Sequence, residues 1–244
     1  MTWPFENDTS GIVKRISNRS ISANRKRNIF IVLTIVLASA LLSAIVLYGF
    51  GVMQETQNRN QKTAQIMYHA ISEQQGQELY KQEEIAWVGE FFNAFSEQVN
   101  HSTVNFTYAN ADMLTSQSMP YSGDLPASEN EIVVQESFLD SLGYSNELGQ
   151  TIQIPFSDGT THDFKLTGIL DVKTGDIGRY TAIISKELVR QQYGDGGMID
   201  YYIGLKGAQN MSEEEATNYA NTLAQQLKIS DDNVIVRSTY FNLK

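Results

Sequence analysis

The chain has 244 residues with a formal net charge of −10, so it is long enough for one or two domains with a hydrophobic core. It contains no cysteine, which excludes thiol chemistry and thiolate metal sites. Its acidic balance and lack of a basic stripe argue against nucleic acid as a partner.

Residues 29–53 form a run of 25 residues without a charge. At about 1.5 Å per residue, a helix of this length exceeds the roughly 30 Å hydrocarbon thickness of a bilayer. The run is also longer than the apolar region of a cleaved signal peptide, about 7–15 residues. We therefore predict a cytoplasmic segment at 1–28, a transmembrane helix at 29–53 and an extracytoplasmic domain at 54–244.

Charge predicts the orientation of this helix. Residues 1–28 carry six basic and two acidic side chains, a net charge of +4, whereas the remainder carries 12 basic and 26 acidic ones, a net charge of −14. Basic residues that flank a span stay on the cytoplasmic side. Arg25, Lys26 and Arg27 are therefore the predicted topology-determining residues, with the N-terminus in the cytoplasm and the helix in contact with plasma-membrane lipid.

Two further patterns concern this part of the chain. Ile12, Val13 and Ile16 share a helical face within the basic stretch 11–27, which indicates either a helix on the inner membrane surface or a disordered basic flank. Within the span, small residues recur at a spacing of four, a pattern that lets another helix approach closely although small residues are common in any span. The candidate helix-packing face consists of Ser39, Ala40, Ser43 and Ala44.

Beyond the span, strand and helix signals alternate. A strand at 63–70 is followed by a helix that a Ser72/Gln75 capping box opens, ending near 82, and by a strand at 84–89. The C-terminal part repeats this order, with a strand at 199–206, a helix from Ser212 to about 227 and a strand at 233–238. These are two β-α-β units.

The residues between the two units are rich in strands. The predicted strands are 104–109, 131–134, a hairpin of 151–156 with 163–170, and 180–184; short helices are predicted at 137–142 and 186–193, and a loop through about 130. We therefore predict an α+β ectodomain on one N-terminal transmembrane helix. Its porter-like β-α-β units, 63–89 and 199–238, bracket a β-rich insertion at about 104–198.

A search for reactive groups finds none of the common catalytic or binding motifs. His69, His101 and His162 lack metal-ligand spacing, and there is no nucleophile elbow or phosphate-binding loop. We therefore expect no catalytic residue, no metal and no cofactor in this chain.

The order of segments carries a family resemblance. SANRKRNIFIVLTIVLASALL at 22–42 resembles the start of FtsX-like ABC-transporter permeases. LPASENEIVVQESFLDSLGYSNELGQTIQIPF at 125–156, followed by KLTGIL at 165–170, is similar to the MacB-type extracytoplasmic domain. The resemblance covers most of residues 12–238, with no single diagnostic motif.

The resemblance implies partners and a function. Members of this family pair with a cytoplasmic ABC ATPase and work as dimers, and ATP hydrolysis moves an extracytoplasmic domain for export, extraction or signalling. They have four spans, whereas residues 1–244 hold one, so we expect a truncation or one part of a split permease. The remaining permease helices or a second permease copy would then pack against the span.

Two other functions stay open. A membrane protein with one span could be a sensor or binding protein whose ectodomain recognises an extracellular ligand. An exported enzyme is the third alternative, which the empty motif search disfavours. A neighbouring ATPase gene would support the permease, and a kinase-like partner would support the sensor.

Overall fold

The computed structural model describes residues 9–172, 179–194 and 199–241. The first eight residues of the expected cytoplasmic segment, and residues 173–178 and 195–198 of the expected insertion, lie outside this part. The chain divides into two units, Met1–Thr56 and Gln57–Lys244.

The N-terminal unit is helical. Helix α1 spans Ser10–Ala23, so the basic stretch forms a helix and not a disordered flank. Helix α2 runs over Arg25–Lys62, and its portion Arg25–Gln54 is long and apolar enough to cross a membrane, with a mean hydropathy of 2.9 over its most apolar 18 residues. The helix extends beyond the predicted 29–53 because Arg, Lys, Gln and Glu residues, which favour helix, flank the apolar run.

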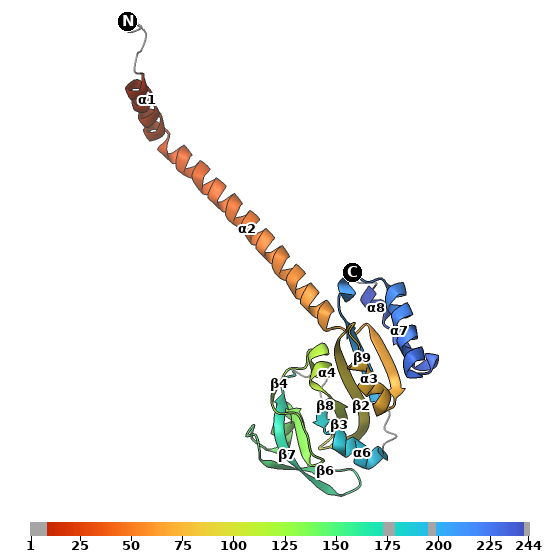
Figure 1. Cartoon of the computed structure of the whole chain (residues 1–244). Coiled ribbons are helices and arrows are strands. Elements are labelled where there is room, and N and C mark those ends of the chain that lie inside the picture. Colours follow the sequence, from red (N-terminus) through yellow and green to blue (C-terminus); the bar gives the residue numbers. More distant parts are fainter. Residues whose placement is uncertain (1–8, 173–178, 195–198, 242–244) are drawn as a thin grey trace. The chain divides into compact units, whose positions relative to one another are not determined.

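The second unit is built on one ten-stranded sheet, with helices packed against it (Figure 1). The strands are β1 (Ile66–Ile71), β2 (Ile85–Val99), β3 (Ser102–Ala109), β4 (Tyr121–Gly123), β5 (Glu131–Gln135), β6 (Thr151–Pro155), β7 (Thr161–Leu170), β8 (Arg179–Ile184), β9 (Ile199–Leu205) and β10 (Val234–Val236). The helices are α3 (Glu73–Leu79), α4 (Ala111–Ser116), α5 (Glu136–Leu142), α6 (Lys186–Tyr193), α7 (Glu213–Leu227) and α8 (Ser238–Phe241). Short 3-10 turns occupy Ala208–Asn210 and Asp231–Asn233.

The two terminal β-α-β units interleave. The strand order is β10-β1-β9-β2-β3-β8-β5-β7-β4, with β6 on β7. Strand β9 therefore lies between β1 and β2, and β1 lies between β10 and β9, in antiparallel pairs. This split β-α-β arrangement confirms the predicted fold class of two β-α-β units that bracket a strand-rich insertion.

The insertion continues the same sheet because β2 changes partner along its length. Residues Ile85–Phe91 pair with β9, and Phe91–Val99 pair with β3. The predicted end of this strand at residue 89 was wrong, since the sequence pattern does not show that a second partner takes over. On the other edge of β3, strand β8 pairs with β3 in parallel orientation, and β5 then pairs with β8 in antiparallel orientation.

Two other local predictions need correction. The predicted loop before residue 130 contains helix α4, whose start is capped by Asn110 Oδ1, which accepts a hydrogen bond from Met113 N at 2.9 Å, and it also contains β4. The last strand, β10, covers only Val234–Val236 and is shorter than the predicted strand at 233–238, because helix α8 begins at Ser238.

Helices cover the two faces of the sheet unequally. Helices α3 and α7 pack on one face of the β-α-β part, and α5 and α6 pack with the insertion, each burying an apolar cluster. Both predicted capping boxes, Ser72 with Gln75 and Ser212 with Glu215, are present. Gly76 lets α3 approach the sheet, because a Cβ there would overlap the ring of Tyr201. Helix α4 packs on the opposite face.

Candidate functional site: membrane helix and polar joint

The predicted helix-packing face lies on α2. Ser39, Ala40, Ser43 and Ala44 are all exposed within the N-terminal unit, and positions three and four apart share one side of a helix. Ser39 Oγ donates to the Val36 carbonyl at 2.9 Å, so its hydroxyl is satisfied inside the helix. Such a face can accept another helix without leaving the Ser39 hydroxyl unpaired in lipid.

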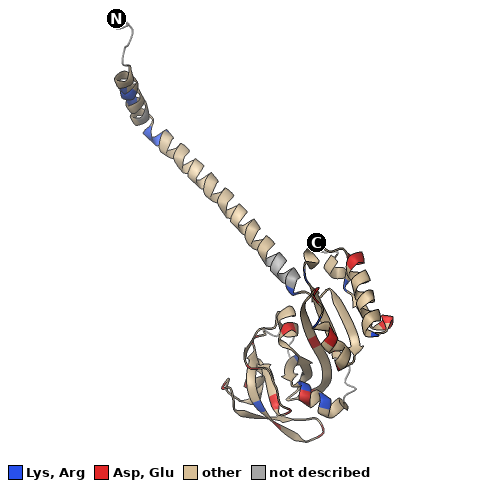
Figure 2. Cartoon of the chain, in the orientation of Figure 1, with Lys and Arg blue, Asp and Glu red and all other residues tan. Residues whose placement is uncertain are grey.

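Arg25, Lys26 and Arg27 occupy the first turn of α2 and are exposed. Figure 2 shows these cations immediately before the charge-free length of the helix. Cations at a helix N-terminus oppose the helix dipole, at a cost of about 0.3–1 kcal/mol each. Helix stability therefore does not explain their position, whereas retention on the cytoplasmic side of a membrane would.

The three histidines lie in separate places. His69 Nδ1 is 2.7 Å from Asp200 Oδ1, His101 lies in the turn between β2 and β3, and the ring of His162 stacks on Phe156 at 4.2 Å. In the described part of the chain, no group of three or more His, Asp or Glu residues could hold a metal ion.

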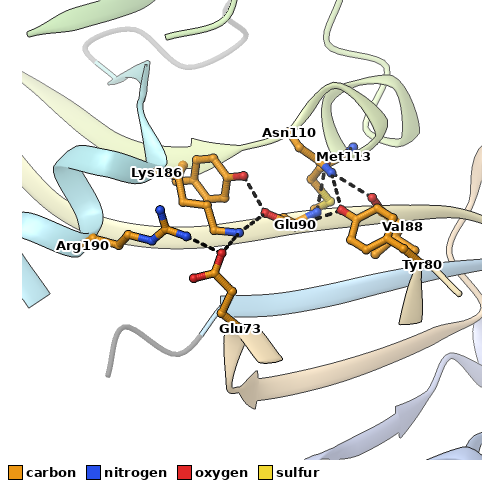
Figure 3. Close-up of polar contacts among 9 residues, drawn as sticks. Glu73, Tyr80, Val88, Glu90, Asn110, Met113, Lys186 and Arg190 are labelled. Carbon is orange, nitrogen blue, oxygen red and sulfur yellow. Dashed lines mark hydrogen bonds and ion pairs between the residues drawn. The ribbon is translucent and has the colours of Figure 1, made fainter. Parts of the chain in front are cut away.

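A polar cluster around the buried Glu90, which no sequence motif predicted, connects the β-α-β part to the insertion (Figure 3). We call it the polar joint, and its residues are Glu73, Tyr80, Glu90, Tyr108, Asn110, Lys186 and Arg190. Glu73 lies in α3 and Tyr80 directly follows that helix. Glu90 lies in β2, Tyr108 lies in β3 and Asn110 is the N-cap of α4. Lys186 and Arg190 lie in α6. The joint therefore unites segments from both parts of the sheet domain.

Glu90 is the centre of the joint and is only 4% exposed. Its Oε1 accepts a hydrogen bond from Tyr80 Oη at 2.9 Å, and its Oε2 accepts from Tyr108 Oη at 2.6 Å and Lys186 Nζ at 2.9 Å. Burial, and secondly the Glu90 charge, raises the pKa values of Tyr80 and Tyr108. Both hydroxyls therefore stay protonated and donate to the carboxylate.

A second carboxylate completes the ion-pair network. Lys186 Nζ lies 3.1 Å from Glu73 Oε1, and the Arg190 guanidinium bonds the same oxygen. The hydrogen bond from Arg190, followed by the effect of Lys186, holds the pKa of the Glu73 carboxyl below its usual range. Lys186 therefore joins α6 to both α3 and β2.

Asn110 fixes the other end of the joint. Its Oδ1 accepts hydrogen bonds from the backbone N–H of Glu90 at 3.0 Å and of Met113 at 2.9 Å, and its Nδ2 donates to the Val88 carbonyl at 2.8 Å. Helix α4 is thereby tied to β2. With its charges paired, the joint resembles a structural connection more than a reactive centre, since a general base needs a free acceptor.

One sequence signal could have revealed the joint. Glutamate is disfavoured inside strands and rarely buried unless it is paired. Glu90 interrupts the apolar strand IAWVGEFF at residues 85–92, so a buried cation partner was predictable. The identity of that partner was not, because Lys186 lies 96 residues further along the chain.

The chain is similar to known proteins in sequence pattern and in fold. Residues 29–223 match the family model of the MacB-like periplasmic core domain. The search of curated protein sequences finds no match.

Solved structures of two extracytoplasmic transporter domains are similar to this chain in fold. The extracellular domain of the ABC-type transporter YknZ from Gram-positive bacteria has a TM-score of 0.51 at 10% identity, covering 72% of this chain and 100% of that one. The periplasmic region of MacB from Actinobacillus actinomycetemcomitans has a TM-score of 0.50 at 13% identity, covering 70% and 86%. Identities this low show a shared fold alone, whereas the family model covers most of the chain, so this chain belongs to the family of MacB-like periplasmic core domains of ABC-transporter permeases.

Proposed function

We propose that this chain is a permease subunit, or its N-terminal portion, that couples ATP hydrolysis by a cytoplasmic ABC ATPase to movement of its extracytoplasmic domain. In this proposal residues 1–28 are cytoplasmic, the span lies within α2, and the sheet domain from residue 54 onward is outside. The chain itself is not an enzyme, and the ATPase is a separate subunit. A second permease copy or further permease helices pack on the face of Ser39, Ala40, Ser43 and Ala44.

The observation that best supports the proposal is the short connection between α2 and the sheet. Only residues 63–65 separate the end of α2 from the start of β1. Three residues reach at most about 3.6 Å each, so a displacement of the helix end leaves little slack before β1 must follow. Strand β1 pairs on both edges, and β2 with the polar joint would carry the movement on to the insertion.

Topology is the first test of the proposal. A reporter that works only outside the cytoplasm, fused after Lys244, should be active. Replacing Leu41 by Arg should impair insertion, since a charge in mid-span costs about 2.5–3.5 kcal/mol on the insertion scale. An inactive fusion, together with activity of a second reporter that works only in the cytoplasm and is fused at the same position, would refute the orientation.

Association is the second test. The ATPase encoded beside this gene and the other permease helices should co-purify with the chain. Ala40→Leu should reduce recovery of the helices by filling the proposed packing face, whereas Ala38→Leu makes the same change on the opposite side of α2 and should not. Equal recovery with both variants would exclude this face. If no ATPase associates and the chain binds an extracellular ligand, the proposal fails in favour of a membrane sensor.

A further inference from the structure

The face of the sheet opposite the polar joint contains a cavity of about 250 Å³. It lies over β2, β3 and β8, beside α4. We propose that this cavity binds an uncharged ligand that carries amide groups. The inference goes beyond the coupling to an ATPase, because it concerns the sheet domain alone and holds whether or not an ATPase associates.

Polar side chains without charge line one part of the cavity: Asn93, Asn105, Thr107, Gln117 and Thr181. Among the described residues, no Asp, Glu, Lys or Arg lines the cavity, although 19% of the chain is charged. An ionised ligand would lose hydration there without gaining a counter-charge. The lining therefore selects neutral ligands.

Most of these polar side chains form no hydrogen bond with another described residue. In the described residues, Asn105 Oδ1 accepts a hydrogen bond from Ser96 Oγ, but the side chains of Asn93, Thr107 and Thr181 form none. Thr107 is 5% exposed as a whole residue, but its hydroxyl is not among the fully buried atoms without a partner, so the hydroxyl is accessible from the cavity. A hydroxyl that faces the cavity can both donate a hydrogen bond to a bound ligand and accept one from it.

The remaining lining is apolar. Met113, Leu114 and Ile183 are buried beneath the cavity, and Phe91 and Met119 are half-buried beside it. Methionine side chains adapt to ligands of irregular shape. An apolar floor with a few convergent hydrogen-bonding groups is the usual composition of a small-molecule site, and this volume is slightly below the usual range of about 300–1,000 Å³.

Amide groups match this lining because carboxamides and hydroxyls both donate and accept hydrogen bonds. A peptide bond and an N-acetyl group of an amino sugar offer the same chemistry, with a carbonyl acceptor, an N–H donor and a small apolar group. Either source fits the cavity, which has room for one or two such units.

Methyl NMR of the full-length chain in detergent micelles tests the proposal. With ¹³C-labelled methionine methyl groups, acetyl-alanyl-alanine amide or N-acetylglucosamine should shift the signals of Met113 and Met119 saturably. Met67 and Met211, which do not line the cavity, serve as internal references. The probe that binds identifies the source of the amide. The free acid acetyl-alanyl-alanine differs from the peptide amide by one charge and should bind more weakly.

A matched pair of variants locates the binding. Thr107→Val keeps the shape of the side chain but removes the hydroxyl and should weaken binding about 2- to 10-fold, the value of one hydrogen bond. Thr151→Val makes the same change on an exposed strand position away from the cavity and should have no effect. The absence of a saturable shift with both amide probes, or equal affinity in the wild type and Thr107→Val, would overturn the proposal.

Discussion

The two faces of β2 and β3 carry opposite kinds of polar chemistry. On one face, Glu90 and Tyr108 belong to the charged polar joint, in which each is paired. On the other face, Asn93 and Thr107 line an open cavity whose described lining carries no charge, and their side chains form no hydrogen bond within the described residues. Alternate residues of a strand point to opposite faces, so neighbouring positions can serve these different purposes.

This difference indicates that the face with the polar joint holds the domain together, whereas the face with the cavity is free to bind a ligand. A buried charge costs several kcal/mol unless it is paired, so the joint penalises any separation of α3, β2 and α6. An unpaired neutral hydroxyl beside an open cavity costs far less and retains its capacity for a new hydrogen bond. The joint should therefore respond strongly to mutation in stability, and the cavity weakly.

The largest effect is expected from Lys186→Met. This change removes the cation from Glu90, whose side chain is 5% exposed, and should cost about 3–5 kcal/mol of unfolding free energy. Urea titration of the detergent-solubilised chain, followed by the fluorescence of Trp87, measures the loss. The double variant Glu90→Gln/Lys186→Met should recover much of it, and Lys206→Met, at an exposed position, is the control. A loss below 1 kcal/mol would mean that the joint does not stabilise the domain.

A smaller effect is expected from substitutions of Tyr108 and Thr107, adjacent residues of β3 whose side chains lie on opposite faces of the sheet. Tyr108→Phe removes a hydrogen bond to the Glu90 carboxylate and should cost about 1.5–3 kcal/mol. Thr107→Val, one position earlier, removes an unpaired hydroxyl and should change stability by less than about 0.5 kcal/mol. The same titration measures both. Equal losses from the two variants would contradict the distinction between the faces.

The smallest effect concerns how the stability of the domain depends on acidic pH. Because Arg190 and Lys186 depress the pKa of Glu73, its ionised form contributes stability that is present above about pH 4.3 and lost as the pH falls through the depressed value. The Glu73 side chain is 38% exposed, so solvent screening keeps this contribution well under about 1 kcal/mol. Glu73→Gln should flatten the stability profile below about pH 4.3 relative to wild type. An unchanged profile would show that the pair contributes nothing.

Local patterns in the sequence account for much of the fold. The charge-free run of 29–53 predicted the long apolar helix, since the requirement to span a bilayer is set by composition and length. The capping residues Ser72 and Ser212 marked the starts of α3 and α7, because caps act over three or four residues. Alternating apolar residues indicated the β6–β7 hairpin for the same local reason.

Only the tertiary structure decided the contacts between distant residues. The length of β2, the place of β9 between β1 and β2, and the pairing of Glu90 with Lys186 depend on which strands lie side by side. The cavity likewise forms where α4 leaves part of the sheet face open. Spacing along the chain determines a local element and the face it presents, but the partner of that face is chosen by packing over the whole domain, where burial and charge pairing are settled together.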